Sequence, residues 1–117
     1  MELKFTIEFY EKLNKKCPVI EYLKKQTQKT EDKILAYLHN LSIFQAFRQE
    51  PYSRQIEKKL RELRVETKEG SHRIFYFMII NKKIILLHAF SKKTKKTPRM
   101  ETKKALEYME EYLSRCK

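Results

Sequence analysis

Five basic side chains follow one another closely near the end of the chain, shortly after an apolar segment that ends at Phe90. They are Lys92, Lys93, Lys95, Lys96 and Arg99. Cations held on a short connection between two ordered elements have fixed directions, which the binding or cleavage of a phosphodiester requires. The alternative is a solvated basic loop that forms no site.

Two arginines flank a predicted turn at Gly70, a residue that adopts a positive φ without steric cost. In an antiparallel hairpin around this turn, Arg64 and Arg73 lie on opposite arms and close to each other. Each guanidinium can donate two hydrogen bonds to one phosphate. The alternative is a structural ion pair of Arg64 with Glu62 or Glu66, which is the commoner fate of a strand arginine.

The histidines allow proton transfer but predict no metal site. His72 and His88 titrate near neutral pH, although a lone histidine in a strand is more often structural. None of His39, His72 and His88 has Cys, Asp or Glu at ligand spacing. Because a single glycine cannot build a phosphate-binding or dinucleotide-binding loop, we expect neither a metal nor a cofactor.

Positive charge increases toward the C-terminal third of the chain. The formal net charge is +12, and residues 81–117 carry eleven Lys and Arg against four Asp and Glu. Such a polarised surplus attracts nucleic acid, the ribosome or an acidic partner. Cys17 and Cys116 do not make a disulfide framework, and no signal peptide or membrane-spanning run is visible. These features predict a cytoplasmic protein that does not enter the membrane.

The hydrophobic pattern predicts a single α+β domain over residues 1–117. Alternation or β-branched and aromatic runs predict four strands, containing residues 3–10, 62–67, 73–80 and 83–90. Helices are predicted to begin at Pro18, after a cap at Thr30, and at Thr97-Pro98. Residues 43–54 look irregular. The resulting order is β-α-α-β-β-β-α, with a small antiparallel sheet, the first strand on an edge and the helices packed on one face.

Three sequence blocks occur in a recognisable order and spacing. They are "E-L-R" at 62–64, "G-x-x-R-I-x-Y" at 70–76, and "L-H-x-F-x-K-K-T" at 87–94 followed by Thr97-Pro98. Together they resemble the RelE/ParE superfamily of toxins from type II toxin–antitoxin systems, in its phage-derived, HigB-like branch. The resemblance covers about residues 56–110.

The resemblance implies a RelE-like fold and a ribosome-dependent endoribonuclease, in which the RNA 2′-hydroxyl attacks the adjacent phosphate of translated mRNA. It also implies a cognate antitoxin, with a helix-turn-helix domain that provides the only link to operator DNA. Carried over by position, Arg64 and Arg73 hold the phosphate, and Lys92 or Lys93 stabilises the transition state or protonates the leaving oxygen. Lys59 and His88 are further catalytic candidates. Lys95, Lys96 and Arg99 are assigned to RNA binding.

The sequence departs from this pattern at one point. Several relatives have a proton-transferring or stacking tyrosine near the start of the last helix, whereas here Tyr108 is the first tyrosine after Pro98. Two alternative functions follow from the same features: a ParE-like poison of DNA gyrase, and a non-enzymatic RNA- or DNA-binding module. The cluster at Lys92–Lys96 favours the ribonuclease over the gyrase poison, and the placed arginines favour it over simple binding.

Overall fold

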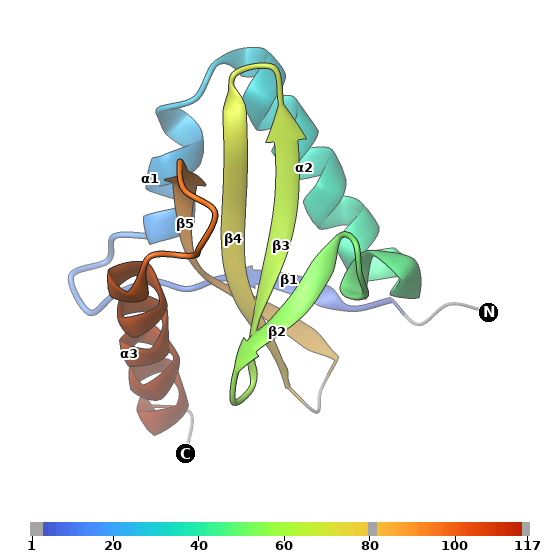
Figure 1. The fold of residues 1–117 in the computed structure, drawn as a ribbon. Coiled ribbons are helices and arrows are strands. Elements are labelled where there is room, and N and C mark those ends of the chain that lie inside the picture. Colours follow the sequence, from blue (N-terminus) through green and yellow to red (C-terminus); the bar gives the residue numbers. More distant parts are fainter. Residues whose placement is uncertain (1–3, 80–81, 116–117) are drawn as a thin grey trace.

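A five-stranded sheet forms the centre of the computed structural model, which describes residues 4–79 and 82–115. The strand order is β1-β5-β4-β3-β2 (Figure 1). The strands are β1 (Thr6–Phe9), β2 (Ser53–Glu57), β3 (Leu60–Thr67), β4 (Gly70–Ile79) and β5 (Lys83–Lys92). The predicted α+β class and the edge position of the first strand are confirmed. The expectation of a purely antiparallel sheet is wrong, because three successive hairpins set the direction of β5 and β1 pairs with it in parallel.

The strand β2 was not predicted. It follows a short 3₁₀ helix, η1 (Gln45–Arg48), and a turn at Pro51, and it pairs antiparallel with β3. Ile56 is the one apolar residue among the five, so no apolar–polar alternation distinguishes this edge strand from the surrounding irregular segment. The observed order is therefore β-α-α-β-β-β-β-α.

The helices cover both faces of the sheet, so the prediction that they pack on one face is wrong. The helices α1 (Pro18–Lys24) and α2 (Gln28–Ile43) pack on one face, and α3 (Arg99–Arg115) packs on the other (Figure 1). In β4, Ile74 and Tyr76 face α1 and α2, whereas Phe75 and Phe77 face α3. Continuous apolar runs in the central strands require cover on both sides. No helix in the described ranges is long and apolar enough to cross a membrane.

Local signals placed most element starts correctly. Pro18 occupies the first turn of α1 as predicted. The cap of α2 is Thr27 and not Thr30: the Thr27 side chain accepts a hydrogen bond from the Thr30 backbone nitrogen. Gly70 adopts φ +142°, in agreement with the expected turn. At the next hairpin Lys82 has φ 58°, while Asn81, expected to take the left-handed conformation, lies outside the described residues.

A β-bulge in β5 changes which side chains face α3. Tyr76 pairs with Leu86, but its neighbour Phe75 pairs with His88, which leaves Leu87 as an extra residue. Leu87 and His88 both lie on the α3 side, since Leu87 packs in the α3 core and His88 contacts Glu101. Every second residue after the bulge therefore faces α3.

The helix α3 covers only part of its face of the sheet. Its buried residues Ala105, Met109 and Tyr112 pack against the apolar ends of β3, β4 and β5. In Figure 1, α3 lies at the lower left of the sheet, and no helix lies in front of β3 and β4. The uncovered part is where the polar residues of these strands gather.

Candidate functional site

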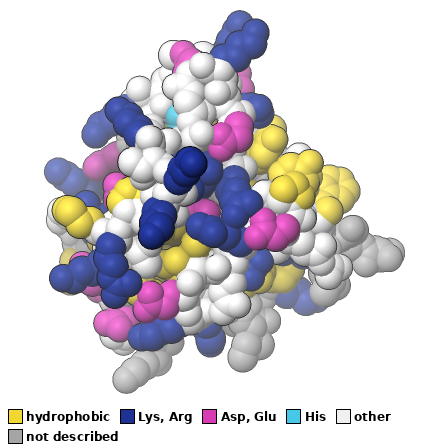
Figure 2. All heavy atoms as spheres, in the orientation of Figure 1, with side chains coloured by type: hydrophobic (Ala, Val, Ile, Leu, Met, Phe, Trp, Pro, Cys, Tyr) yellow, Lys and Arg dark blue, Asp and Glu magenta, His cyan; other side chains and the backbone are white. Residues whose placement is uncertain are grey.

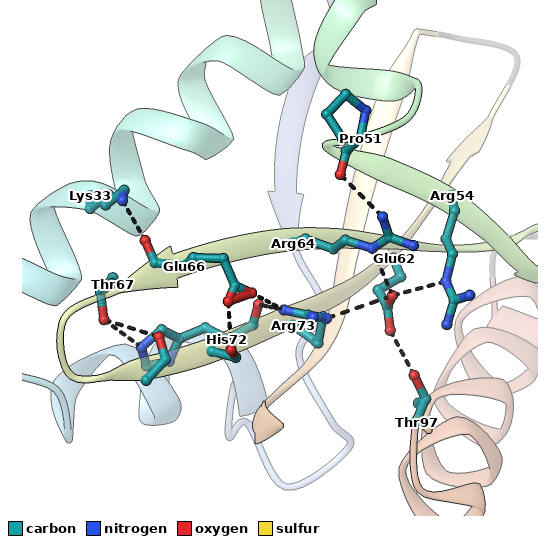
Figure 3. A network of polar contacts seen from close by, with 12 residues as sticks. Lys33, Pro51, Arg54, Glu62, Arg64, Glu66, Thr67, His72, Arg73 and Thr97 are labelled. Atoms are coloured by element: carbon teal, nitrogen blue, oxygen red, sulfur yellow. Dashed lines mark hydrogen bonds and ion pairs between the residues drawn. The ribbon is translucent and has the colours of Figure 1, made fainter. Parts of the chain in front are cut away.

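A buried carboxylate lies among arginines on the uncovered part of the α3 face. Glu62 of β3 is 0% exposed. Its Oε1 atom lies 3.2 Å from Nε of Arg54 and 3.7 Å from Nε of both Arg64 and Arg73. Its Oε2 atom accepts a 3.1 Å hydrogen bond from Thr97 (Figure 3). We call Arg54, Arg64 and Arg73 together with Glu62 the arginine cluster.

Strand register brings the arginine cluster together. Arg54 pairs with Glu62 across β2 and β3, and Arg64 pairs with Arg73 across β3 and β4. Because alternate residues of a strand share a face, Glu62 and Arg64 point to the same side. The predicted closeness of Arg64 and Arg73 is confirmed. Arg54 was missed because β2 was missed, and residues 53–57, with Ile56 as their one apolar residue, carry no alternation that would have revealed the strand.

The outer nitrogens of two of these arginines contact exposed carboxylates. Nη1 of Arg64 lies 2.8 Å from Glu50, and Nη1 of Arg73 lies 2.9 Å from Glu66; the two glutamates are 65% and 60% exposed. Burial raises the pKa of Glu66, but hydrogen bonds from Ser71 and Arg73 outweigh it, so that the pKa is lowered. The predicted ion pairing of Arg64 with Glu62 therefore exists, at the long distance of 3.7 Å, beside the closer contact with Glu50.

Arg73 is the most deeply placed cation of the arginine cluster, with a side chain only 10% exposed. Its Nε atom is buried and has no hydrogen-bond acceptor among the residues that the structure describes, since Glu62 lies beyond hydrogen-bonding distance. Burying an unpaired donor is costly. Arg73 is therefore held in place by its neighbours, at a cost that a purely structural ion pair would avoid.

Lys92 lies next to the arginine cluster at the end of β5. It pairs with Ser71 of β4, and the bulge turns it toward the α3 side. Burial lowers the pKa of the Lys92 ammonium, and the positive charges of Arg73, Arg54 and Arg64 lower it further, against the opposing effect of the Glu62 carboxylate. A lysine with a lowered pKa gives up its proton more readily than an ordinary lysine, which suits it to protonate a leaving group.

The other cations of the predicted basic segment differ from Lys92 in exposure. Lys93, Lys95, Lys96 and Arg99 are exposed. The loop that carries most of them is joined to the arginine cluster by the hydrogen bond from Thr97 to Glu62. Lys92 is half-buried at the end of β5, whereas Lys93 follows the strand and is exposed, so the two neighbours to which the sequence assigned one role are held differently.

His88 lies beneath the start of α3. Its side chain is 11% exposed, its Nε2 atom is 2.6 Å from Glu101, and its ring stacks on Phe90 at 5.8 Å. Burial lowers the pKa of His88 below its usual value, in spite of the nearby Glu101 carboxylate. These contacts join α3 to β5, and they place His88 outside the arginine cluster. Its catalytic role stays a prediction.

Lys59 lies in the turn between β2 and β3, beside Lys58, Arg61 and Met78. It precedes Arg64 by five residues, which corresponds to about 16 Å along an extended strand. No hydrogen bond or ion pair joins Lys59 to the arginine cluster in the part of the chain that the structure describes, and its assignment also stays a prediction.

A second polar group lies on the opposite face, near the same end of the sheet. The hydroxyl of Tyr22 in α1 lies 2.6 Å from Nδ1 of His72 and 2.9 Å from Oγ of Ser91, and Nε2 of His72 lies 3.2 Å from Thr67. His72 is 2% exposed, and burial lowers its pKa. This group joins α1 to the sheet, which fits the structural reading of a strand histidine.

The α3 face presents cations without a metal-binding geometry. In Figure 2, Lys and Arg side chains gather in the middle of this face, with Asp and Glu among them. Over residues 4–79 and 82–115, no group of three His, Cys, Asp or Glu side chains could hold a metal ion. Three guanidiniums and an ammonium around a shallow surface favour a phosphate-bearing ligand.

The fold matches a solved structure of the free E. coli toxin RelE, in a form with two arginines replaced by alanine. The TM-score is 0.59 at 9% sequence identity, and the match covers 90% of this chain and 97% of that chain. At this identity the likeness shows a common fold. No curated protein sequence gave a significant match.

A family model of phage-derived proteins matches residues 21–110, which span α1 to most of α3 and include the whole arginine cluster and Lys92. The chain therefore belongs to the family described as phage derived protein Gp49-like (DUF891).

Proposed function

We propose that this protein is the toxin of a type II toxin–antitoxin pair and cleaves translated mRNA on the ribosome. The observation that carries the proposal is the arginine cluster with Lys92 beside it, on a part of the sheet that no helix covers. The RelE-like fold and the resemblance to HigB-like toxins support the same activity. A gyrase poison with this fold would not need cations gathered around one point.

In the proposed reaction, Arg64 and Arg73 hold the phosphate that undergoes attack. The RNA 2′-hydroxyl attacks phosphorus and loses its proton to solvent, while the bond from phosphorus to the 5′-oxygen breaks. Lys92 donates its proton to that oxygen, so the products are a 2′,3′-cyclic phosphate and a 5′-hydroxyl. The guanidiniums offset the charge that develops on the phosphoryl oxygens, and their fixed positions make this effective.

The remaining cations serve association. Lys93, Lys95, Lys96 and Arg99 attract the phosphates of mRNA and ribosomal RNA over a longer range. A cognate antitoxin neutralises the toxin, and its helix-turn-helix domain contacts operator DNA. The antitoxin and the ribosome both belong to the cytoplasm, where translation takes place.

The test is inducible expression in bacteria without an antitoxin, followed by mapping of mRNA 5′ ends. We expect growth arrest and cuts within reading frames that require translation. The control is Lys24→Ala/Lys25→Ala, on α1 at the opposite face, which should remain toxic. DNA damage without mRNA cuts would favour the gyrase poison, and no growth defect would reject a toxin.

A further inference from the structure

We propose that Arg54 is a third guanidinium that contacts the RNA phosphate, and that Glu62 is the positioning residue for all three arginines. This inference rests on the function proposed above and deepens it. The resemblance to known toxins assigned a role to neither residue. Both assignments depend on the strand β2, which places Arg54 directly opposite Glu62.

The first observation is which nitrogen of each arginine Glu62 contacts. Its Oε1 atom faces the Nε atoms of Arg54, Arg64 and Arg73, at 3.2, 3.7 and 3.7 Å. Nε is the inner nitrogen of a guanidinium, so an acid held there leaves the two outer nitrogens for another partner. A single buried carboxylate thus orients three guanidinium groups around one point.

The second observation is the state of the outer nitrogens. Those of Arg64 and Arg73 meet Glu50 and Glu66, which are mostly exposed and contribute little as surface pairs. Arg54 is 38% exposed, and the only ion pair that its side chain makes within the described ranges is the one to Glu62. An incoming phosphate can replace the two exposed carboxylates and use the free outer nitrogens of Arg54.

The third observation is the difference in burial among the three acids. The Glu62 side chain is 0% exposed, whereas the side chains of Glu50 and Glu66 are mostly exposed. A buried charge with several fixed partners holds its neighbours in one arrangement, while exposed acids exchange with solvent. Glu62 also accepts the hydrogen bond from Thr97, so it links the arginines to the loop that follows Lys92.

A comparison of acid substitutions separates positioning from simple charge. Glu62→Gln and Glu50→Gln each remove one negative charge beside Arg64. If charge alone mattered, both would strengthen binding of a single-stranded oligoribonucleotide. If Glu62 positions the arginines, Glu62→Gln lowers kcat for ribosome-bound mRNA at least tenfold with little change in KM, whereas Glu50→Gln leaves oligonucleotide binding equal or stronger.

Arg54 supplies the independent test, because its partly exposed side chain can be removed without emptying the core. Arg54→Ala should lower kcat by about 10²-fold, the lower end of the loss for one such donor. Arg54→Lys, which keeps the charge but lacks the two outer nitrogens of a guanidinium, should recover only part of the rate. Lys25→Ala, which removes one exposed cation on the opposite face, is the matched control for charge.

Melting temperatures measured alongside show whether each variant folds. If Glu62→Gln does not fold, the Arg54 series decides the proposal. Wild-type kcat in folded Glu62→Gln, or an Arg54→Ala enzyme equal to Lys25→Ala, would overturn it while mRNA cleavage by the wild type stands. If the wild type cleaves no RNA, oligonucleotide affinity alone decides: weaker binding by Arg54→Ala than by Lys25→Ala supports Arg54 as a phosphate contact, and equal binding rejects it.

Discussion

The cations of the sheet and the cations of the loop between β5 and α3 carry the same charge but differ in how they are held. Arg64 and Arg73 are 27% and 10% exposed and are fixed by carboxylates of β3 and of the turn before β2. Lys95 and Lys96 are exposed on the loop. Fixed charges stabilise a transition state because they need no reorganisation during the reaction, whereas solvated charges act mainly through long-range attraction.

The largest expected effect is on the sheet cations. Lys92→Ala should abolish toxicity, since the loss of one donor of this kind costs about 2.7–4 kcal/mol, or about 10²–10³ in rate. Lys93→Ala, one residue further on, should keep most of the toxicity. Growth assays and single-turnover cleavage rates compare the two variants. Equal losses of activity for the two lysines would show that sheet and loop cations do not differ in function.

Arg73→Ala should abolish toxicity as well, but with a cost to folding. Because Arg73 is largely buried between Glu62 and Glu66, its removal leaves a cavity and takes one of three arginines away from the buried Glu62 carboxylate, so the variant should lose stability. Lys92→Ala, which removes a more exposed cation, should change the stability much less. Chemical denaturation of the two variants should show this difference, and capture by the antitoxin should persist in both if they fold.

The next effect is on the pH dependence of cleavage. A protonated Lys92 is required as the acid, so activity should fall as pH rises through its pKa, which is lowered from 10.5 by burial and by Arg73, Arg54 and Arg64. In Arg54→Ala one of these charges is absent, and the alkaline limb should move to higher pH. Single-turnover rates over an alkaline series measure this; an unmoved limb would indicate that Lys92 is not the titrating group.

A smaller effect is expected from the loop. Lys95→Ala/Lys96→Ala/Arg99→Ala should weaken ribosome association. The slope of log affinity against log salt should fall by about 2, because each of three lost phosphate contacts on a single strand accounts for about 0.7. The rate of bound complexes should change little. If the triple variant has the wild-type salt slope but loses the chemical step, the loop cations belong with the sheet cations.

The smallest effect is on stability in mild acid and concerns groups outside the arginine cluster. His72 and His88 both have a lowered pKa, chiefly through burial. The unfolded chain, with histidine pKa values near 6.5, therefore binds protons first as the pH falls, so the free energy of unfolding should decrease from pH 7 toward pH 5.5. Denaturation of His88→Gln, which keeps a donor for Glu101, should show a shallower decrease; an identical decrease would contradict the assignment of His88.

Some of this site is determined by local sequence. The turn at Gly70 sets the pairing of β3 with β4, and counting outward from the pair Thr67–Gly70 reaches Arg64 opposite Arg73. The β-branched and aromatic runs likewise specify β4 and β5, and Pro18 marks the start of α1. These features depend on residues close together in the chain, so the sequence alone determined them.

Other features were decided only by tertiary structure. Packing against α3 accommodates the extra residue Leu87 in β5, and this bulge puts Lys92 on the face of Arg73; without it the two-residue period would turn Lys92 to the opposite face. The pairing of β2 with β3 brings Arg54 to Glu62. Both features depend on contacts between elements that are far apart in the chain, and a local sequence pattern does not report the free energy of such contacts. The sequence therefore indicated the cations, and the packing of the sheet determined which of them lie together.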